Sequence, residues 1–240
     1  MLGSMTCDSL FKSNDPSLNL KYILSLECYF MLLLGADEAG KGPVVGSMFV
    51  AGLVVEEDRL FDLAGWGVRD SKLLSPAKRE ILARKISTIA SDQYILEVKP
   101  QVIDELRAVM TMNEIMVRSF SQVLSRLHAD QAMLDAADVD AERFADRVKA
   151  ASKTEMLVLA EHKADQHHTI VSAASILAKV SRDASMKELE AAMNCKIGSG
   201  YPHDQITLDF LSRWARENRD LPSCARHSWA TAQRIKASFI

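Results

Sequence analysis

The sequence predicts an α/β protein in which a mixed β-sheet is flanked by helices. Two apolar stretches, 31–36 and 44–55, adjoin through a short glycine-rich segment, which is typical of a β-hairpin. Further strand patterns at 94–98, 132–135 and 155–160 then alternate with helical patterns. Local strand pairing followed by such alternation favours a mixed sheet with helices packed against it.

The helices are expected between and after these strands. Ser75 followed by Pro76 is typical of a helix N-cap and first helical position, and apolar residues then recur with a helical period. A second helical pattern extends from Pro100 to about Leu127. The remaining helices are expected at 141–151, 169–193, 204–217 and 228–237.

Composition limits the class of protein. A chain of 240 residues with 48% apolar content can form one domain, or one domain with an appendage. The net charge of −3 argues against a globally basic nucleic-acid binder. However, residues 213–240 hold six basic residues against two acidic ones, which indicates a cationic C-terminal surface or, alternatively, a solvated helix face.

Residues 1–30 are expected to be an N-terminal extension or an added, non-native segment, with the domain starting near Met31. The chain has no apolar span of eighteen residues, so no membrane association is expected. Its four cysteines form neither a C-x-x-C pair nor a zinc spacing, which fits a cytoplasmic protein.

Four acidic residues are candidates for a metal centre. Asp37, Glu38 and Asp135 stand where apolar strands end, and Asp165 stands between a strand and the long helix. Converging carboxylates repel one another unless cations hold them, and all-oxygen ligation favours Mg²⁺ or Mn²⁺ over Zn²⁺. Two such ions about 4 Å apart are suited to phosphodiester hydrolysis. Alternatively, Asp135 caps a turn and Asp165 caps a helix.

The segment Gly40-Lys41-Gly42 directly follows the first two acids. Its glycines allow backbone amides to approach a ligand closely, and Lys41 adds a positive charge. We therefore expect a metal site beside a phosphate or sugar site. A non-catalytic nucleic-acid binder and a phosphosugar or nucleotide enzyme are the competing classes.

Seven blocks of sequence share one resemblance. They read GADEAGKGPVVG at 35–46, DSKLL at 70–74, LDAADV at 134–139, EHKAD at 161–165, VSAASILAKVSRD at 171–183, GSGYP at 198–202 and RHSW at 226–229. In content, order and spacing, over about residues 31–235, they resemble type 2 ribonuclease H, the ribonuclease HII family. The resemblance is closer to archaeal and eukaryotic catalytic chains than to bacterial ones.

This resemblance implies a ribonuclease H-like fold with a five-stranded mixed sheet. It implies a catalytic domain over 31–195 and a C-terminal helical, substrate-binding extension over 196–240. The implied enzyme is a monomeric endoribonuclease that acts in DNA replication and ribonucleotide excision. It would cut the RNA strand of RNA/DNA hybrids, and ribonucleotides embedded in duplex DNA, by two-metal hydrolysis that leaves 3′-hydroxyl and 5′-phosphate ends.

The resemblance also implies roles for individual residues. The family's catalytic, metal-binding acids match Asp37, Glu38, Asp135 and Asp165, with Asp37 between two Mg²⁺ or Mn²⁺ ions. The loop that contacts the 2′-hydroxyl matches Gly40, Lys41 and Gly42, and the tyrosine at the RNA–DNA junction matches Tyr201.

Further substrate contacts follow from residue type. Lys72, Lys179 and Arg182 are candidates for phosphate contacts, although a solvated helix face is the alternative for the last two. Ser172 and Ser175 either contact phosphate or pack within a crowded helix.

Two features depart from the expected pattern. The family usually carries arginine between the loop glycines, whereas this chain has Lys41, as ribonuclease HIII does. Lysine keeps the charge but lacks the planar guanidinium fork. How strictly the enzyme requires an RNA–DNA junction therefore does not follow from the resemblance. The tail at 233–240 resembles sliding-clamp-binding peptides, and Lys236 and Ile240 depart from that pattern, which implies at most a weak clamp contact.

Overall fold

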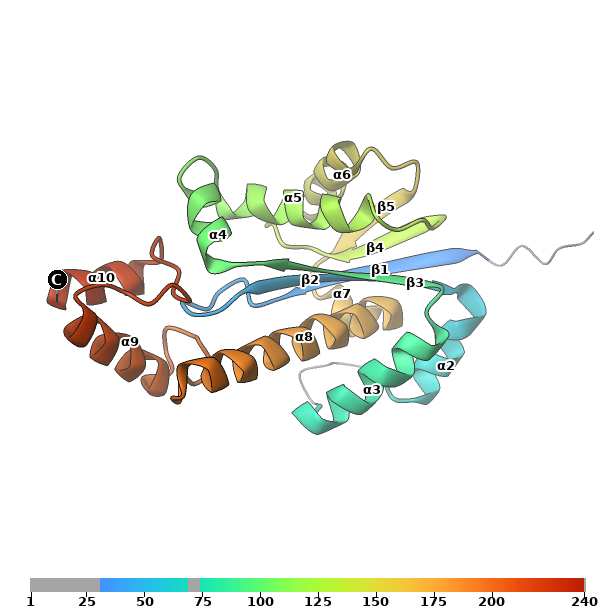
Figure 1. The fold of residues 1–240 in the computed structure, drawn as a ribbon. Coiled ribbons are helices and arrows are strands. Elements are labelled where there is room, and N and C mark those ends of the chain that lie inside the picture. Colours follow the sequence, from blue (N-terminus) through green and yellow to red (C-terminus); the bar gives the residue numbers. More distant parts are fainter. Residues whose placement is uncertain (1–30, 69–73, 240) are drawn as a thin grey trace, which may run out of the picture. The chain divides into compact units, whose positions relative to one another are not determined.

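The computed structural model describes residues 31–68 and 74–239. The predicted N-terminal extension and Lys72 lie outside the described residues. Within the described part, the five strands form one sheet in the order β3-β2-β1-β4-β5 (Figure 1). Their bounds are β1 Leu32–Ala39, β2 Met48–Glu56, β3 Asp92–Val98, β4 Gln131–Asp135 and β5 Leu157–Glu161.

The sheet is mixed, as the sequence predicts. Strands β1, β2 and β3 pair antiparallel, while β1 pairs parallel with β4, and β4 with β5. In the parallel pair Ala36 lies opposite Leu134, so the residues that follow, Asp37 and Asp135, are neighbours at the same edge. The topology therefore brings together two acids that are almost one hundred residues apart in the chain.

Helices cover both faces of the sheet (Figure 1). On one face lie α4 (Pro100–Arg107), α5 (Met112–Leu124) and α6 (Ala141–Ser152), and Phe120 packs edge-to-face on Phe144 in their core. On the other lie α2 (Leu60–Gly65), α3 (Pro76–Ile89), α7 (Ala164–His167) and α8 (Thr169–Met193), with a short 3₁₀ turn, η2 (Glu57–Arg59), ahead of α2.

The long helix α8 lies close against β1 because of one glycine. A Cβ atom at Gly35 would lie 2.5 Å from the backbone carbonyl carbon and oxygen of Ile170. No larger residue fits there without moving the helix. This contact fixes α8, which carries several candidate site residues, against the strand that carries the first two acids.

The helical pattern from Pro100 to Leu127 is not continuous in the structure. It divides into α4 and α5, and Thr111 caps the second helix. The Thr111 hydroxyl accepts a hydrogen bond from the Glu114 amide, and the Glu114 carboxylate accepts one from the Thr111 amide. This capping box begins a new helix although the apolar periodicity continues through it.

The C-terminal part is helical, as expected. Helices α9 (Gln205–Asn218) and α10 (Ala230–Phe239) pack together beyond the end of the sheet (Figure 1). Their apolar residues join Val44 and Val45, which precede β2, and the amides of both valines donate to the Gly200 carbonyl. The C-terminal part is thereby attached directly to the segment that follows the first two acids.

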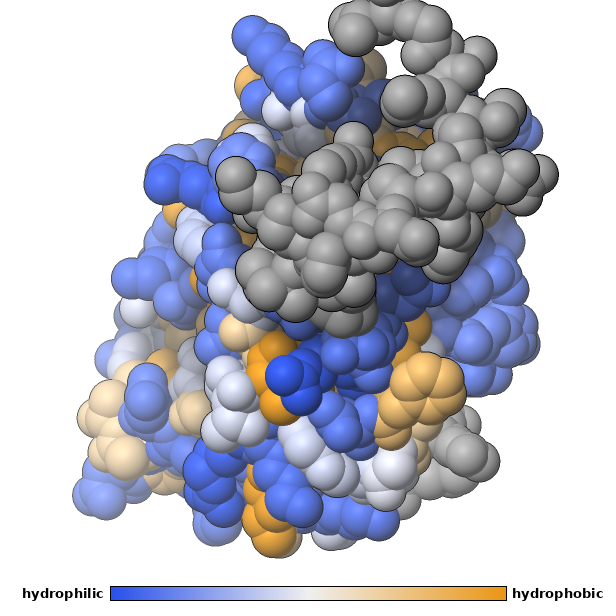
Figure 2. Space-filling model, turned by 90° about the vertical axis from the view of Figure 1, so that its right-hand side faces the viewer, coloured by the Kyte–Doolittle hydropathy of each residue, from blue (hydrophilic) through white to orange (hydrophobic). Residues whose placement is uncertain are grey.

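The visible surface is mainly polar (Figure 2). On the face at which β1 begins, hydrophilic residues predominate outside the grey atoms, with scattered apolar ones (Figure 2). None of the described helices has both the length and the apolarity needed to cross a membrane.

Candidate active site

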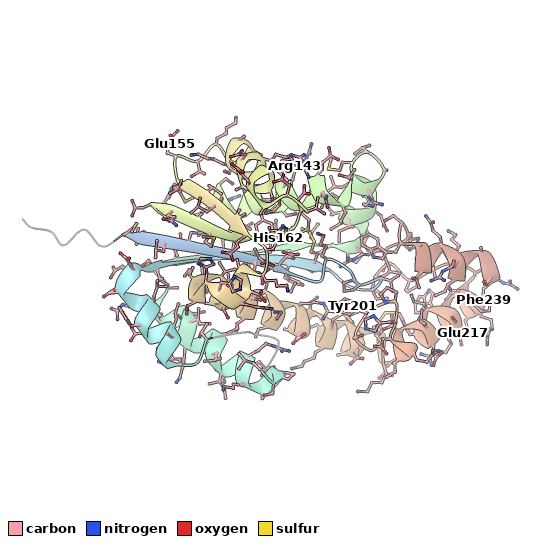
Figure 3. The ribbon with its side chains drawn as sticks, turned by 180° about the vertical axis from the view of Figure 1, so that it is seen from behind. Arg143, Glu155, His162, Tyr201, Glu217 and Phe239 are labelled. Carbon is pink, nitrogen blue, oxygen red and sulfur yellow. The ribbon has the colours of Figure 1, made fainter. Side chains whose placement is uncertain are left out.

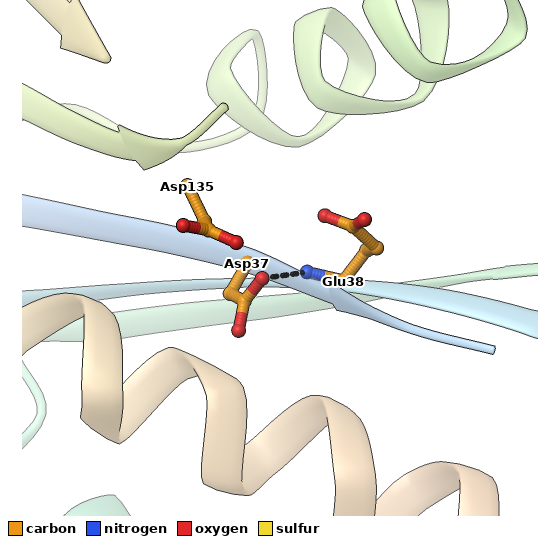
Figure 4. A group of neighbouring side chains, drawn as sticks. All are labelled: Asp37, Glu38 and Asp135. Carbon is orange, nitrogen blue, oxygen red and sulfur yellow. Dashed lines mark hydrogen bonds between the residues drawn. The ribbon is translucent and has the colours of Figure 1, made fainter. Parts of the chain in front are cut away.

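Three of the four predicted acids meet at the end of β1. Asp37, Glu38 and Asp135 each present a carboxylate oxygen, and these three oxygens lie within 4.8 Å of one another (Figure 4). Asp37 is further fixed by a hydrogen bond of 2.7 Å from the amide of Glu38 to its Oδ1. The arrangement has the donor type and spacing that a divalent cation requires.

The electrostatics of these acids favour a bound cation. Burial, reinforced by the charge of Asp135, raises the pKa of Asp37 to about 7. Burial and the charge of Asp37 raise the pKa of Glu38 to about 8, against the opposing effect of Lys41. The Glu38 side chain also has a buried Oε2 with no hydrogen-bond partner among the described residues. An orphaned carboxylate oxygen beside two other carboxylates fits a metal ligand.

The fourth predicted acid, Asp165, lies nearby on α7 but outside the group defined by the 4.8 Å spacing. It is buried, with 3% of its surface exposed. The preceding residue, Ala164, donates its amide to Asp135 Oδ1 at 2.8 Å. The start of α7 is therefore hydrogen-bonded to Asp135, one of the three acids that could hold a metal ion.

The predicted serines and Lys179 lie on the face of α8 that meets the acids. Ser175 is fully buried and donates a hydrogen bond to Asp37, and Lys179 Nζ donates to the Ser175 hydroxyl at 2.8 Å. Ser172 is 1% exposed and its hydroxyl has no partner among the described residues. In this structure Ser175 orients the Asp37 carboxylate from inside the protein.

The glycine loop, Gly40 to Gly42, comes shortly after Asp37 and Glu38 in the chain. Gly40 has a φ of +86°, and a Cβ there would lie 2.9 Å from the Ser47 carbonyl oxygen, so both conformation and space require glycine. The Lys41 ammonium group donates to the Ala137 carbonyl at 2.7 Å. A Cβ at Gly42 would lie 3.6 Å from Cε1 of Tyr201, which places the predicted tyrosine against the loop.

A pocket lies between Glu38, the glycine loop and a set of cations. It is lined by Glu38, Ala39, Gly40, Lys41, Gly42, Arg79, Lys179, Arg182, Asp183 and Tyr201. The Arg182 guanidinium lies 5.1 Å from the centre of the Tyr201 ring and also donates to the Ser199 carbonyl. Figure 3 shows Tyr201 on the side of the molecule that leads to the C-terminal helices.

Two residues of this region were not assigned a role from sequence. Arg79, on α3, lines the pocket and binds Asp183 at 2.9 Å, and its Nε has no partner among the described residues. Arg226 is fully buried and binds carbonyls of the glycine loop. Arg79 belongs to an amphipathic helix with several other cations, so nothing in its sequence context singled it out. Arg226 stands in the RHSW block, which contributed to the family resemblance but was assigned no function from sequence.

Comparison with known proteins agrees with this site. The family model described as Ribonuclease HII matches residues 34–232. The chain is 61% identical over 210 residues to ribonuclease HII of Methanothrix thermoacetophila, covering 88% of this chain and 100% of that protein.

Solved structures of archaeal proteins are also similar. Ribonuclease H2 of Pyrococcus horikoshii OT3 superposes with a TM-score of 0.82 at 41% identity, covering 87% of this chain and 99% of that one. Ribonuclease HII of Archaeoglobus fulgidus, solved in complex with PCNA, gives a TM-score of 0.76 at 40% identity, covering 83% and 95%. Because the family match spans nearly all of the sheet, the four acids and helix α9, the chain belongs to the ribonuclease HII family, endoribonucleases that hydrolyse the RNA strand of RNA/DNA hybrids.

Proposed function

We propose that this chain cuts the RNA strand by two-metal hydrolysis, leaving 3′-hydroxyl and 5′-phosphate ends, and that it also cuts at ribonucleotides embedded in duplex DNA. The observation that carries the mechanism is the group of three carboxylates within 4.8 Å at the ends of β1 and β4. The buried, unpartnered Oε2 of Glu38 supports the same conclusion.

Four acids of this chain hold the ions in this proposal. Asp37 would be shared by both ions, and Glu38, Asp135 and Asp165 would complete their ligation, with Mg²⁺ in the cell and Mn²⁺ as a substitute. When bound, the ions supply an activated water and stabilise the leaving oxygen. Ser175 and Lys179 keep the Asp37 carboxylate oriented through the hydrogen bonds described above.

The glycine loop and Tyr201 recognise the ribose in this proposal. The backbone amides of Lys41 and Gly42 donate no hydrogen bond to any described residue, and both residues line the pocket. Such amides can bind the 2′-hydroxyl, which distinguishes RNA from DNA, without reading base sequence. The Tyr201 ring packs beside Gly42 and would stack on the neighbouring deoxyribose.

Phosphate contacts come from the basic side of the pocket. Lys179 and Arg182 line it directly, and Lys72 is proposed to join them from outside the described residues. Such contacts position a duplex without specifying its bases. We also propose that residues 196–240 form a substrate-binding extension, since Tyr201 comes from it.

The proposed enzyme is a cytoplasmic monomer. The two cysteines in the described part, Cys195 and Cys224, are both free, as expected in a reducing compartment.

A weak contact with a sliding clamp through the C-terminal tail is proposed as well. Its support is the Archaeoglobus fulgidus relative that was solved with PCNA. Phe239 is half-buried at the end of α10 (Figure 3). Arg216 packs on its ring, and Arg219 donates to its carbonyl. Clamp binding would require this last turn to detach, which agrees with a weak contact. Deleting residues 234–240 should abolish clamp binding in calorimetry and leave hybrid cleavage unchanged.

The activity is tested with labelled oligonucleotides. An RNA/DNA hybrid and a DNA duplex with one ribonucleotide are incubated with Mg²⁺, with Mn²⁺ or with chelator, and the product ends are mapped. We expect metal-dependent cleavage of both substrates and loss of cleavage by orders of magnitude in Asp37→Asn with hybrid binding retained. The exposed Asp146 provides the control Asp146→Asn.

Other outcomes identify the competing classes. Binding of the hybrid without cleavage in any metal would indicate a non-catalytic binder. Neither binding nor cleavage would favour a small-molecule enzyme. Cleavage of the hybrid but not of the single ribonucleotide would refute the junction proposal and leave the chemistry standing.

A further inference from the structure

Arg226 is the largest fully buried side chain of the described residues, and it has an unusual set of partners. Its guanidinium donates to the carbonyl oxygens of Gly40 at 2.6 Å, Lys41 at 2.9 Å and Gly46 at 2.9 Å, and its Nε donates again to Gly46 at 3.0 Å. No carboxylate takes part in these bonds. The buried charge is therefore directed at the backbone of the glycine loop, where charge-assisted bonds are strong.

Trp229 adds to the same contact. Its indole Nε1 donates to the Gly42 carbonyl at 3.1 Å, and its ring stacks on the Arg226 guanidinium, 4.9 Å from the ring centre. The residues between them are fixed by Asp104 of α4, whose carboxylate accepts from the amides of His227 and Ser228 at 2.7 and 2.9 Å. The Arg226–Trp229 segment is thus held on α4 by hydrogen bonds.

These bonds determine the direction of the loop amides. In a trans peptide, the carbonyl oxygen and the following N–H point in opposite directions. With the Gly40 and Lys41 carbonyls turned toward Arg226, the amides of Lys41 and Gly42 point away from it. Neither amide donates to another described residue, and the pocket lined by Lys41 and Gly42 includes neither Arg226 nor Trp229.

We propose that Arg226 and Trp229 are positioning residues that preset the glycine loop for ribose recognition. They hold the Lys41 and Gly42 amides toward the substrate before it binds, so that no ordering of a glycine-rich loop opposes binding. The inference rests on the proposed function, in which these amides bind the 2′-hydroxyl. It adds that discrimination between ribose and deoxyribose depends on side chains that never touch the substrate.

The test compares binding of two duplexes that differ in one 2′-hydroxyl. One is all DNA and the other carries a single ribonucleotide, and both dissociation constants are measured with full-length protein in calcium, with cleavage monitored in the same samples. Arg226→Lys keeps the charge but cannot supply the guanidinium fork. Trp229→Phe keeps a ring and removes one donor. Trp214→Phe is the matched control, because Trp214 packs on Phe210 in the same C-terminal core.

We expect Arg226→Lys to reduce the preference for the ribonucleotide duplex about tenfold or more, since small misplacements of positioning groups are costly. Trp229→Phe should reduce it by about threefold, as expected for one lost neutral hydrogen bond. Affinity for the all-DNA duplex should be unchanged in both. Deuterium exchange of residues 40–47 should rise in these two variants and not in Trp214→Phe.

The ratio is insensitive to partial unfolding, because an inactive fraction weakens the measured binding of both duplexes equally. If Arg226→Lys folds poorly, Trp229→Phe alone decides the question. An unchanged preference in Trp229→Phe and Arg226→Lys, or an equal loss in Trp214→Phe, overturns the inference. Absence of any preference in the wild-type protein refutes the recognition role of the loop itself, which is a failure of the proposed function.

Discussion

Neutralising Asp37 is expected to stabilise the metal-free protein at alkaline pH while destroying its activity. The pKa of Asp37 is raised from 3.8 to about 7 by burial and by Asp135. Because its pKa is higher in the folded state than in the unfolded state, Asp37 contributes fully to the free energy of unfolding below about pH 3.8. This contribution is lost as the pH rises through about 7. Ionised Asp37 therefore opposes folding at pH 8.5 when no cation is present.

The magnitude follows from the shift. Each pKa unit corresponds to about 1.4 kcal/mol, so the ionisation penalty is on the order of 4 kcal/mol. The amide in Asp37→Asn would lose part of the bonding that the Asp37 carboxylate makes with Ser175 and the Glu38 amide, at a cost of about 1–2 kcal/mol. We expect Asp37→Asn to unfold at a higher temperature than wild type by roughly 4–12 °C in chelator at pH 8.5, for a chain of this size.

Thermal unfolding at pH 5 and pH 8.5 in chelator tests this expectation. The advantage of Asp37→Asn should disappear at pH 5, because the penalty between pH 3.8 and 5 is only about 1.6 kcal/mol and the hydrogen bonding lost in the variant offsets it. The exposed Asp146→Asn variant should behave as wild type at both pH values. If Asp37→Asn is less stable than wild type at pH 8.5, the carboxylate is satisfied by its hydrogen bonds, and the reasoning from burial is wrong.

Three further predictions concern the same framework. Saturating Mg²⁺ should raise the unfolding temperature more at pH 8.5 than at pH 5.5 in differential scanning calorimetry, because protons compete for the ligands below the pKa values of about 7 and 8; an equal effect at both would contradict the site. Ser175→Ala should lower kcat about tenfold with KM little changed, since Asp37 loses its orienting donor, whereas a change in KM alone would indicate a substrate contact. Gly35→Ala should reduce the free energy of unfolding by about 1–3 kcal/mol in urea titrations, because its Cβ would overlap the backbone of Ile170; a neutral effect would show that α8 can shift.

The sheet and most helices were predictable because their signals are local. Alternating and continuous apolar runs mark strands, and the helix expected over 169–193 has these bounds in the structure. The division between α4 and α5 was not predictable from periodicity, since the apolar pattern runs through it. The deciding signal was the chemistry of Thr111 and Glu114, a short-range motif that a periodicity count does not weigh.

The metal-candidate acids were accessible to sequence reasoning for a topological reason. Parallel strands end at one edge of a sheet, so acids that end β1 and β4 must meet there once the two strands pair. This topological reason does not extend to Asp165, because a short helix rather than a strand positions it.

The cations show where sequence reasoning stops. Their charge is visible in the sequence, but their partners are not. Lys41 donates to Ala137, Lys179 to Ser175 and Arg182 to Ser199, so each of these cations already has a protein partner in this structure. A cation held in this way contributes a fixed field to the pocket and loses little side-chain freedom when a phosphate arrives. Arg226 is the most extreme of these cations, because all the hydrogen-bond partners of its side chain are backbone carbonyls 180 or more residues away in the chain. It does not line the pocket. In the proposed recognition of substrate, cations that act on the backbone are therefore as important as cations that reach the substrate.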